Sequence, residues 1–411
     1  MKDIMPAEMQ IRDYVTALVK ETYKTFGFTP IETPAVEHIE NLLSRQGGEN
    51  EKLIFKILKR GEKLVLGADV AEDDLADSGL RYDLTVPLSR FYACHASELP
   101  SPFKALQIGP VWRADRPQKG RFRQFVQCDI DILGDATNLA EIELITATTT
   151  LLGKLDFKDF TVRINDRRIL KAMAAYSGFA EEDYDRVFII LDKMDKIGLD
   201  GVRSELEANG FDRQIVDKYT AMFDTNLSTG TIKDLAATLG DCLPEGCAEG
   251  LEGIIESVER VRSADFNIVF DPTLVRGMSY YTGTIFEITM NEFGSSVAGG
   301  GRYDEMIGRF TGNKVCACGF SIGFERIITI LMDKNFVPPA SLQRYAFLIE
   351  KGASGDFIAS VMEEAAKLRQ TGACVLVSMM NKNKKFQKEQ LENDGFIADN
   401  IKEFYHSDFK N

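Results

Sequence analysis

The sequence predicts an α+β protein with a mostly antiparallel sheet, an inserted helical module and a small C-terminal α/β domain. Three observations favour this fold class. Up to about residue 164, helix-like and strand-like segments form a mostly antiparallel α+β pattern. The stretch from about 170 to 255 is rich in amphipathic helical segments. Two adjacent prolines, Pro338 and Pro339, then mark a linker before alternating strand and helix patterns over roughly 343–411.

The first region opens with an amphipathic helix over residues 8–26, where apolar residues recur at helical spacing and Gly27 ends the helix. The next segment, Phe28-Thr-Pro-Ile-Glu-Thr-Pro34, is extended, because each proline disfavours helical backbone in its predecessor. Before the insertion we also expect strands near 53–57 and 63–67, a helix at 86–95, two strands within 105–133 joined by a basic loop at 114–123, a helix at 138–153 and a strand at 159–164.

Strand patterns return after the insertion, and the rest of the chain divides into the end of one domain and a second domain. For the first domain, residues 1–334, we expect strands at 266–270 and 283–290, a glycine-rich turn within 298–304 and a helix at 321–332. For the second, residues 343–411, we expect strand 345–349, helix 357–370, strand 374–377 and helix 384–393.

Composition excludes several functional classes. Apolar residues make up 44% and charged residues 27% of the 411 residues, as in ordinary globular proteins. No apolar run approaches the roughly 18 residues of a membrane span, and the start lacks a signal-peptide pattern, so a cytoplasmic location is expected. The net charge of −14 argues against a nucleic-acid-coated protein, but permits a partner that touches a few basic loops.

Metal and triad chemistry are poorly supported. The closest cysteine pairs are Cys316 with Cys318 and Cys242 with Cys247, and neither has a second pair or a histidine nearby. The chain has only three histidines. We therefore expect no metal site made by protein residues.

A basic loop between two strands is the first candidate site. Arg113, Arg116, Lys119, Arg121 and Arg123 fall within eleven residues, and rigid guanidinium groups suit phosphate oxygens. A solvated hairpin tip is the simpler alternative. Two observations favour a binding site over this alternative. Aromatic residues that could stack on a base lie between the cations, at Phe122 and Phe125. The strand that follows carries three polar residues on one face, Gln127, Asp129 and Asp131. Cations beside a row of acceptors suit a zwitterionic substrate next to a polyphosphate.

A second group of candidates lies near the end of the first domain. Arg276 precedes the pair Tyr280 and Tyr281, which by themselves are typical of a core. Three glycines, 299–301, permit close approach of backbone to a ligand but are weak evidence. Arg326 lies on an otherwise apolar helix, where either a buried salt bridge or a ligand would compensate its charge.

Together these residues resemble the histidyl-tRNA synthetases, a family of class II aminoacyl-tRNA synthetases. The first helix with Pro34, the Arg113 hairpin through Phe125, and Gly323-Phe-Glu-Arg326 look like the three class II motifs, in order. Family-specific blocks also match: Arg81-Tyr-Asp-Leu-Thr-Val-Pro87, Asn165-Asp-Arg-Arg168, Arg276-Gly-Met-Ser-Tyr-Tyr-Thr-Gly283 and Ala298-Gly-Gly-Gly-Arg-Tyr-Asp304. The resemblance covers residues 1–334 strongly and the tail partially. It implies a class II catalytic domain, a homodimer, and a shortened anticodon-binding-like domain at 343–411.

The resemblance implies activation of L-histidine by ATP with Mg²⁺, followed by transfer to tRNA(His). The implied catalytic residues are Arg113 and Arg276. The implied histidine-binding residues are Asp83, Thr85, Gln127, Asp131, Tyr280 and Tyr281. For ATP they are Arg113, Arg121, Phe125 and Arg326, and for the tRNA acceptor end Arg116, Gln118 and Arg123. The chemistry agrees, since attack of a carboxylate on phosphorus needs alignment and positive charge rather than a protein nucleophile.

The sequence departs from the family pattern at single residues and in its tail. Ser279 replaces a common Asp, and Asp115 a more frequent Glu. The tail leaves little room for the last strand of a five-stranded anticodon-binding domain. Its lysines, 382 to 388, suit either tRNA contact or a solvated helix face.

Two alternatives use the same fold. One is a non-catalytic regulatory subunit of ATP phosphoribosyltransferase in histidine biosynthesis, which the short tail favours. The other is a synthetase-derived enzyme with a different acceptor. The intact set of arginines, acids and tyrosines favours the synthetase over the regulator, because a regulator has no need of every phosphate-binding arginine.

Overall fold

A computed structural model of the chain describes residues 2–43, 53–67, 71–116, 122–224, 231–277, 281–290, 295–339 and 342–409. The chain divides into two compact units, Met1–Phe336 and Val337–Asn411. Within the described ranges, no helix combines the length and the apolar character needed to cross a membrane.

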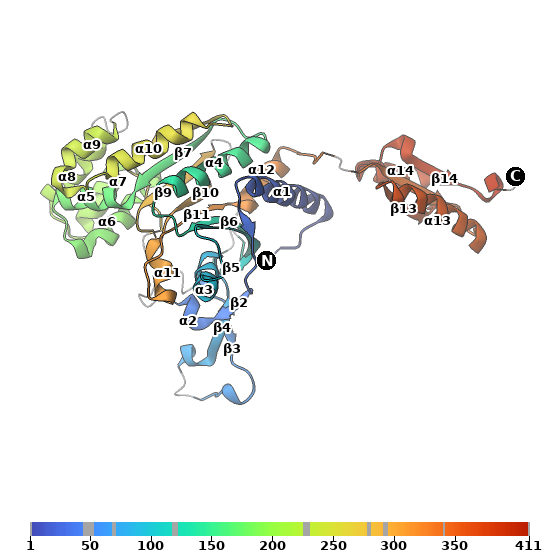
Figure 1. Ribbon diagram of the computed structural model, residues 1–411. Helices are drawn as coiled ribbons and strands as arrows, with labels where there is room; N and C mark the ends of the chain where they lie inside the picture. Colours follow the sequence, from blue (N-terminus) through green and yellow to red (C-terminus); the bar gives the residue numbers. More distant parts are fainter. Residues whose placement is uncertain are drawn as a thin grey trace. The chain divides into compact units, whose positions relative to one another are not determined.

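The first unit is built on an eight-stranded sheet with the order β1-β5-β6-β11-β10-β9-β7-β8 (Figure 1). Only β1–β5 and β7–β8 are parallel pairs, so the sheet is mostly antiparallel and the expected α+β class is confirmed. Its strands are β1 (Thr29–Pro30), β5 (Phe103–Trp112), β6 (Gln124–Leu133), β7 (Phe160–Asp166), β8 (Phe266–Phe270), β9 (Thr284–Met290), β10 (Ser295–Arg302) and β11 (Ala317–Ile322).

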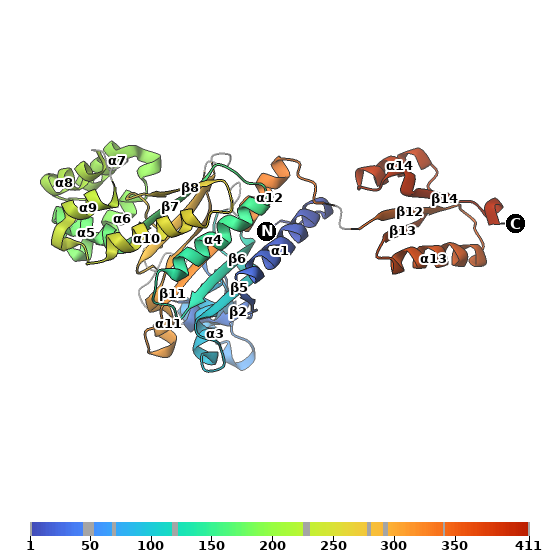
Figure 2. The same ribbon diagram turned by 45° about the horizontal axis from the view of Figure 1, so that its top comes forward.

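Three helices cover one face of this sheet. They are α1 (Pro6–Thr25), α4 (Leu139–Lys154) and α12 (Phe324–Asp333). Figure 2 shows α1 and α4 running side by side along the sheet. Val15, Leu144 and Ile327 from these helices join Ile130 and Ile288 of the strands in one buried core. Burial of this apolar stripe, rather than intrinsic propensity, is what stabilises such helices.

A three-stranded sheet lies between α1 and β5 in the sequence. It has the order β2-β4-β3, with β2 (Val36–His38), β3 (Lys56–Leu58) and β4 (Ala76–Leu80). The strand expected at 63–67 is wrong: a short 3₁₀ turn, Gly61–Lys63, is followed by irregular chain in which Val65 and Leu66 are exposed. An apolar run without a sheet partner does not become a strand. Helix α2 (Ile39–Leu42) packs on this sheet and against α3 (Thr85–His95), and α3 packs in turn against α11 (Asp304–Thr311).

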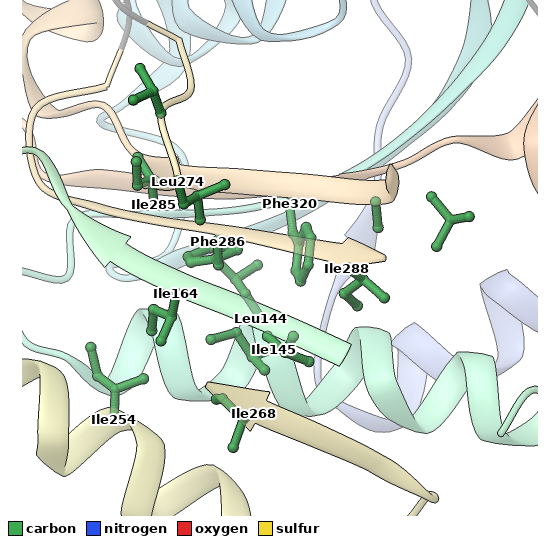
Figure 3. Close-up of a cluster of buried hydrophobic side chains, with 14 of the residues drawn as sticks. Leu144, Ile145, Ile164, Ile254, Ile268, Leu274, Ile285, Phe286, Ile288 and Phe320 are labelled. Atoms are coloured by element: carbon green, nitrogen blue, oxygen red, sulfur yellow. The ribbon is translucent and has the colours of Figure 1, made fainter. Parts of the chain in front are cut away.

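All described elements between β7 and β8 are helical. They are α5 (Arg167–Ser177), α6 (Tyr184–Leu191), α7 (Met194–Ala208), α8 (Arg213–Asp224), α9 (Ile232–Leu239) and α10 (Cys247–Arg260), with 3₁₀ turns at Glu181–Asp183 and Gly240–Cys242. This helical module continues the main core: Ile254 of α10 packs near Leu144 and Ile145 of α4 and Ile268 of β8 (Figure 3). Amphipathic helical segments were expected throughout this stretch, and α6 and α7 are two such helices, separated by Asp192 and Lys193.

The second unit is a parallel three-stranded sheet with the order β13-β12-β14. Its elements are β12 (Arg344–Ile349), α13 (Gly355–Gln370), β13 (Cys374–Met379), α14 (Lys384–Asn393) and β14 (Ile401–Phe404), with 3₁₀ turns at Ala398–Asn400 and His406–Phe409. Phe347 packs with Val361 of α13, whereas Leu348 packs with Leu391 of α14. Successive β12 residues point to opposite faces, so each helix covers one face. The sequence pattern missed β14, a four-residue strand.

Candidate active site

The register of the central sheet separates an apolar face from a polar face. In β6, Cys128, Ile130 and Ile132 belong to the core beneath the helices. The residues between them point the other way, because strand side chains alternate. Strand pairing then places one polar row on the face away from α1 and α4: Gln107, Gln127, Asp129, Asp131, Ser321, Glu287 and Arg163.

The acidic part of this row is buried. Asp129 and Asp131 are each 2% exposed. Burial raises the pKa of Asp131 to about 7; the hydroxyl of Tyr303, which donates to its Oδ1 at 2.6 Å, opposes the shift, and the charge of Asp83 adds to it. Burial, followed by the charge of Asp131, raises the pKa of Asp129 well above its usual range. Such a cluster favours a cation or a proton.

The other expected histidine-binding residues surround these acids. Asp83 accepts a hydrogen bond from the amide of Val86 at 3.1 Å and so holds the start of α3, which begins at Thr85. Burial raises the pKa of the Tyr281 hydroxyl, and the nearby charge of Arg276 opposes this shift while the acids of β6 reinforce it. Arg276 and the acids of β6 are therefore both close enough to act on the Tyr281 hydroxyl. Tyr280 lies outside the described residues.

Glycines in strands β10 and β11 leave space on the polar face for these side chains. The three expected turn glycines, 299–301, lie inside strand β10 instead, so the prediction of a turn is wrong. A Cβ atom at Gly299 would overlap the guanidinium of Arg276, and one at Gly319 would overlap the Asp131 carboxylate. A Cβ at Gly301 would lie 3.0 Å from the ring of Tyr281. Only glycine leaves this space inside a strand.

Two arginines from distant parts of the chain meet at Ser296. Arg276 forms an ion pair with Glu287 of β9 and donates to the Ser296 hydroxyl at 3.2 Å. Arg326, in the first turn of α12, donates to the backbone carbonyl of Ser296. Both guanidinium groups are thus held at Ser296 of β10, and that of Arg276 also lies next to the glycine gap at Gly299.

A third arginine, Arg113, reaches the site from the β5–β6 hairpin. Its guanidinium lies 5.1 Å from the centroid of the Phe125 ring, and its Nε donates to the carbonyl of Tyr82 at 2.9 Å. The next residue after Phe125 donates its backbone N–H to Glu325 at 3.0 Å, and this contact ties the strand of Phe125 to the helix of Arg326.

Two arginines of the outer part of the hairpin lie at the surface. Arg116 and Arg123 are exposed, and Arg123 donates to the carbonyl of Asp115 at 3.2 Å. The expected site residues Gln118 and Arg121 lie outside the described residues. No group of three or more His, Cys, Asp or Glu side chains is arranged to hold a metal ion in the described part of the chain.

Two residues of this site, Tyr303 and Glu287, had no predicted role, and Asp129 was predicted only as one of a row of acceptors. Tyr303 donates to Asp131, Glu287 holds Arg276, and Asp129 lies between Gln127 and Asp131. Tyr303 was within a block used for the family resemblance, and Asp129 shares the two-residue periodicity of β6. Glu287 has no sequence signal, because its pairing with Arg276 depends on the register of β9 against β10.

A mostly antiparallel sheet with helices packed on one face and a row of polar residues on the other is the fold of the class II aminoacyl-tRNA synthetases. Within that class, residues 1–327 match the family model described as "Histidyl-tRNA synthetase". This chain belongs to the histidyl-tRNA synthetase family.

Relatives and a solved structure agree with this family. The chain is 49% identical to a "Histidine--tRNA ligase" of Leifsonia xyli over 350 residues, 83% of this chain and 81% of that protein. It is 40% identical over 410 residues to a "Probable histidine--tRNA ligase" of Tropheryma whipplei, covering 97% and 93%. The fold is similar to the crystal structure of histidyl-tRNA synthetase from Nostoc sp., with a TM-score of 0.77, 28% identity and coverage of 96% and 88%.

Proposed function

We propose that this chain activates L-histidine with ATP to form histidyl-adenylate and transfers the histidyl group to tRNA(His). The family supports this activity, since the curated relatives are histidine--tRNA ligases at high coverage. The observation that carries the proposal is the division of one sheet face into an acidic part and an arginine part. A zwitterionic amino acid and a polyphosphate need those opposite charges side by side.

The acidic part suits histidine. Asp83, Thr85 and Gln127 would hold the α-ammonium group, whereas Asp131 and Tyr281 would bind the imidazole ring, with Tyr280 beside them. The Tyr303 hydroxyl occupies one oxygen of Asp131, and the other, Oδ2, is buried without a hydrogen-bond partner among the described residues. That oxygen can accept an imidazole N–H. A buried acceptor of this kind discriminates strongly against a side chain that lacks the donor.

The arginine part suits ATP. Arg113 would bind the α-phosphate, with Arg121 nearby, while Phe125 and Arg326 would enclose the adenine. Arg276 would lie between the substrate carboxylate and the α-phosphate. A carboxylate oxygen of histidine attacks the α-phosphorus, a P–O bond to the β-phosphate breaks, and pyrophosphate leaves. The arginines would stabilise the negative charge on the phosphoryl oxygens in the transition state, and the Mg²⁺ that accompanies ATP would supply further positive charge there.

The second step uses the same pocket. A ribose hydroxyl of the tRNA acceptor end attacks the histidyl carbonyl, and AMP leaves. Arg116, Gln118 and Arg123 of the hairpin would contact the tRNA. We also propose that residues 343–411 act as an anticodon-binding-like domain, although Lys384 and Lys388 already pair with Glu403.

The proposal includes a cytoplasmic homodimer. The segment that enters α1 and the first turn of that helix expose Ile4, Met5 and Met9, and exposed apolar side chains close together suit an interface. Sedimentation velocity tests this point, because a mass near 46 kDa at micromolar concentration would contradict a dimer.

The regulatory-subunit alternative is less well supported, because the relatives are named as ligases and the polar face retains both its acids and its arginines. Histidine-dependent ATP–pyrophosphate exchange separates the alternatives. Exchange together with charging of tRNA(His) supports the ligase. Exchange without charging favours a different acceptor, and absence of both favours a regulatory role.

A further inference from the structure

The function proposed above leaves Asp129 without a role, although its carboxyl lies at the centre of the acidic row. It is 2% exposed, and it pairs across the sheet with Gln107 of β5 and Ser321 of β11. A buried carboxyl lowers stability unless its hydrogen bonds compensate. A functional role would explain why a carboxyl group occupies this buried position.

The contact that identifies this role is with Gln127. The amide Nε2 of Gln127 donates to Oδ2 of Asp129 at 2.8 Å. A primary amide carries its donor and its acceptor on opposite branches, so holding the nitrogen fixes the direction of the oxygen. The oxygen, Oε1, is buried and has no hydrogen-bond partner among the residues that the structure describes. An acceptor in that state fits a ligand that brings its own donor.

An ionised Asp129 also excludes the reversed amide. A carboxylate only accepts hydrogen bonds, so an amide oxygen turned toward it would face another oxygen and be repelled. Burial and the negative charges of Asp131 and Asp83 raise the pKa of the Asp129 carboxyl, and the same charges make the pocket favourable for a cation. A bound cation in turn favours the charged form of Asp129.

We infer that Asp129 is a positioning residue whose carboxylate orients the amide of Gln127, so that Oε1 accepts a hydrogen bond from the α-ammonium group of the amino acid. The inference rests on the proposed function and adds to it the residue that sets recognition of the ammonium group. Asp129 acts through Gln127 and does not touch the substrate.

Two ligands that each lack one end of histidine test the inference on the full chain. Histidinol keeps the ammonium group, whereas 3-(imidazol-4-yl)propionate lacks it. In Asp129→Asn the amide of residue 127 loses its fixed direction, because a carboxamide can either donate or accept. Histidinol binding should weaken about 10- to 100-fold, whereas propionate binding stays within about twofold. Ligand-observed NMR titration measures both affinities.

A purely structural role for Asp129 gives a different result. Damage to the pocket would weaken both ligands equally, and that outcome, or unchanged histidinol binding, would overturn the inference. If Asp129→Asn folds poorly, Asp129→Ser, which is smaller and neutral, replaces it with the same expected split between the ligands.

A double-mutant cycle tests whether Asp129 acts through Gln127. In a Gln127→Ala background, Asp129→Asn should weaken histidinol binding less than about twofold, because the amide to be oriented is gone. Full additivity of the two substitutions would contradict the inference. Failure of the proposed function itself would appear separately, as absence of histidine-dependent exchange by the wild-type protein.

Discussion

At the scale of single residues, Arg276 is the side chain whose position most directly supports the proposed chemistry. Glu287 and Ser296 hold its guanidinium over the gap at Gly299. Arg276→Ala should lower the exchange rate about 100- to 1,000-fold, because a fixed positive charge beside the reacting phosphate is lost. The thermal midpoint should change little, since the side chain is part-exposed.

The matched control for Arg276→Ala is Arg262→Ala, which removes an exposed arginine that lies over Phe266 at the end of the helical module. This control should retain its exchange rate. An Arg276→Ala protein that retains wild-type exchange would remove Arg276 from the mechanism.

The raised pKa of Asp131 predicts that the stability of the folded chain depends on pH. Its pKa is about 7 in the folded chain and about 4 when unfolded. Between these values the folded state binds more protons than the unfolded state, so stability falls as pH rises from about 4 to 7. Asp131→Asn should remove on the order of 2–4 kcal/mol of that fall.

Thermal denaturation at pH 5 and pH 8, without ligands, measures this effect. The difference between the two midpoints should be smaller in Asp131→Asn than in the wild type. The exposed Asp333, at the end of α12, provides the control: Asp333→Asn should keep the wild-type difference. Equal pH dependence in all three proteins would be evidence against a raised pKa at Asp131.

At the scale of elements, two neighbouring glycines of strand β10 face opposite sides of the sheet. We expect one of them to matter for activity and the other for stability. Gly299 faces the guanidinium of Arg276, which is the end of a long side chain and can move aside. Gly300 faces the opposite way, and a Cβ there would overlap the backbone carbonyl of Gly319 and the buried ring of Phe286. Alanine at position 299 should therefore affect mainly activity, whereas alanine at position 300 should affect mainly stability.

Gly299→Ala should reduce exchange about 10- to 100-fold while the thermal midpoint stays within about 2 °C, because only Arg276 is displaced. Gly300→Ala should lower the free energy of unfolding by about 1–3 kcal/mol or more, because backbone and core must shift. Exchange assays and denaturant titrations on both variants distinguish the effects. A reversed pattern would mean that the two faces of β10 are wrongly assigned.

At the scale of the whole molecule, the two units have separate cores, and Phe347 and Leu348 each belong to a core within the second unit. A chain ending at Phe336 should therefore keep exchange within about threefold of the full chain. Its charging of tRNA(His) should fall at least about tenfold in kcat/KM, because binding to the remote part of the tRNA is lost.

Both steps are measured on the same preparations, with the full chain as the reference. Undiminished charging by the shortened chain would show that the second unit contributes nothing to tRNA binding. Loss of exchange together with charging would show instead that the first unit does not function alone.

Local sequence patterns predicted many elements of this fold. Helical spacing from Ile11 to Tyr23 predicted α1 to within two residues at each end, and alternation predicted β6. The family resemblance supplied the candidate residues that were named. Two predictions from local patterns were wrong. The run at 63–67 was expected to be a strand but has no strand to pair with. Strand β14 was missed, because four residues give too short a pattern.

By itself, the sequence determined the family, the residue types of the site and the amphipathic faces, because these depend on neighbours along the chain. Only the tertiary structure decided that Arg276 and Arg326 meet at Ser296, that Asp129 holds Gln127, and that the glycines of β10 open one face of a strand. Those facts follow from strand register and burial, which depend on contacts between residues far apart in the sequence. No local pattern specifies them.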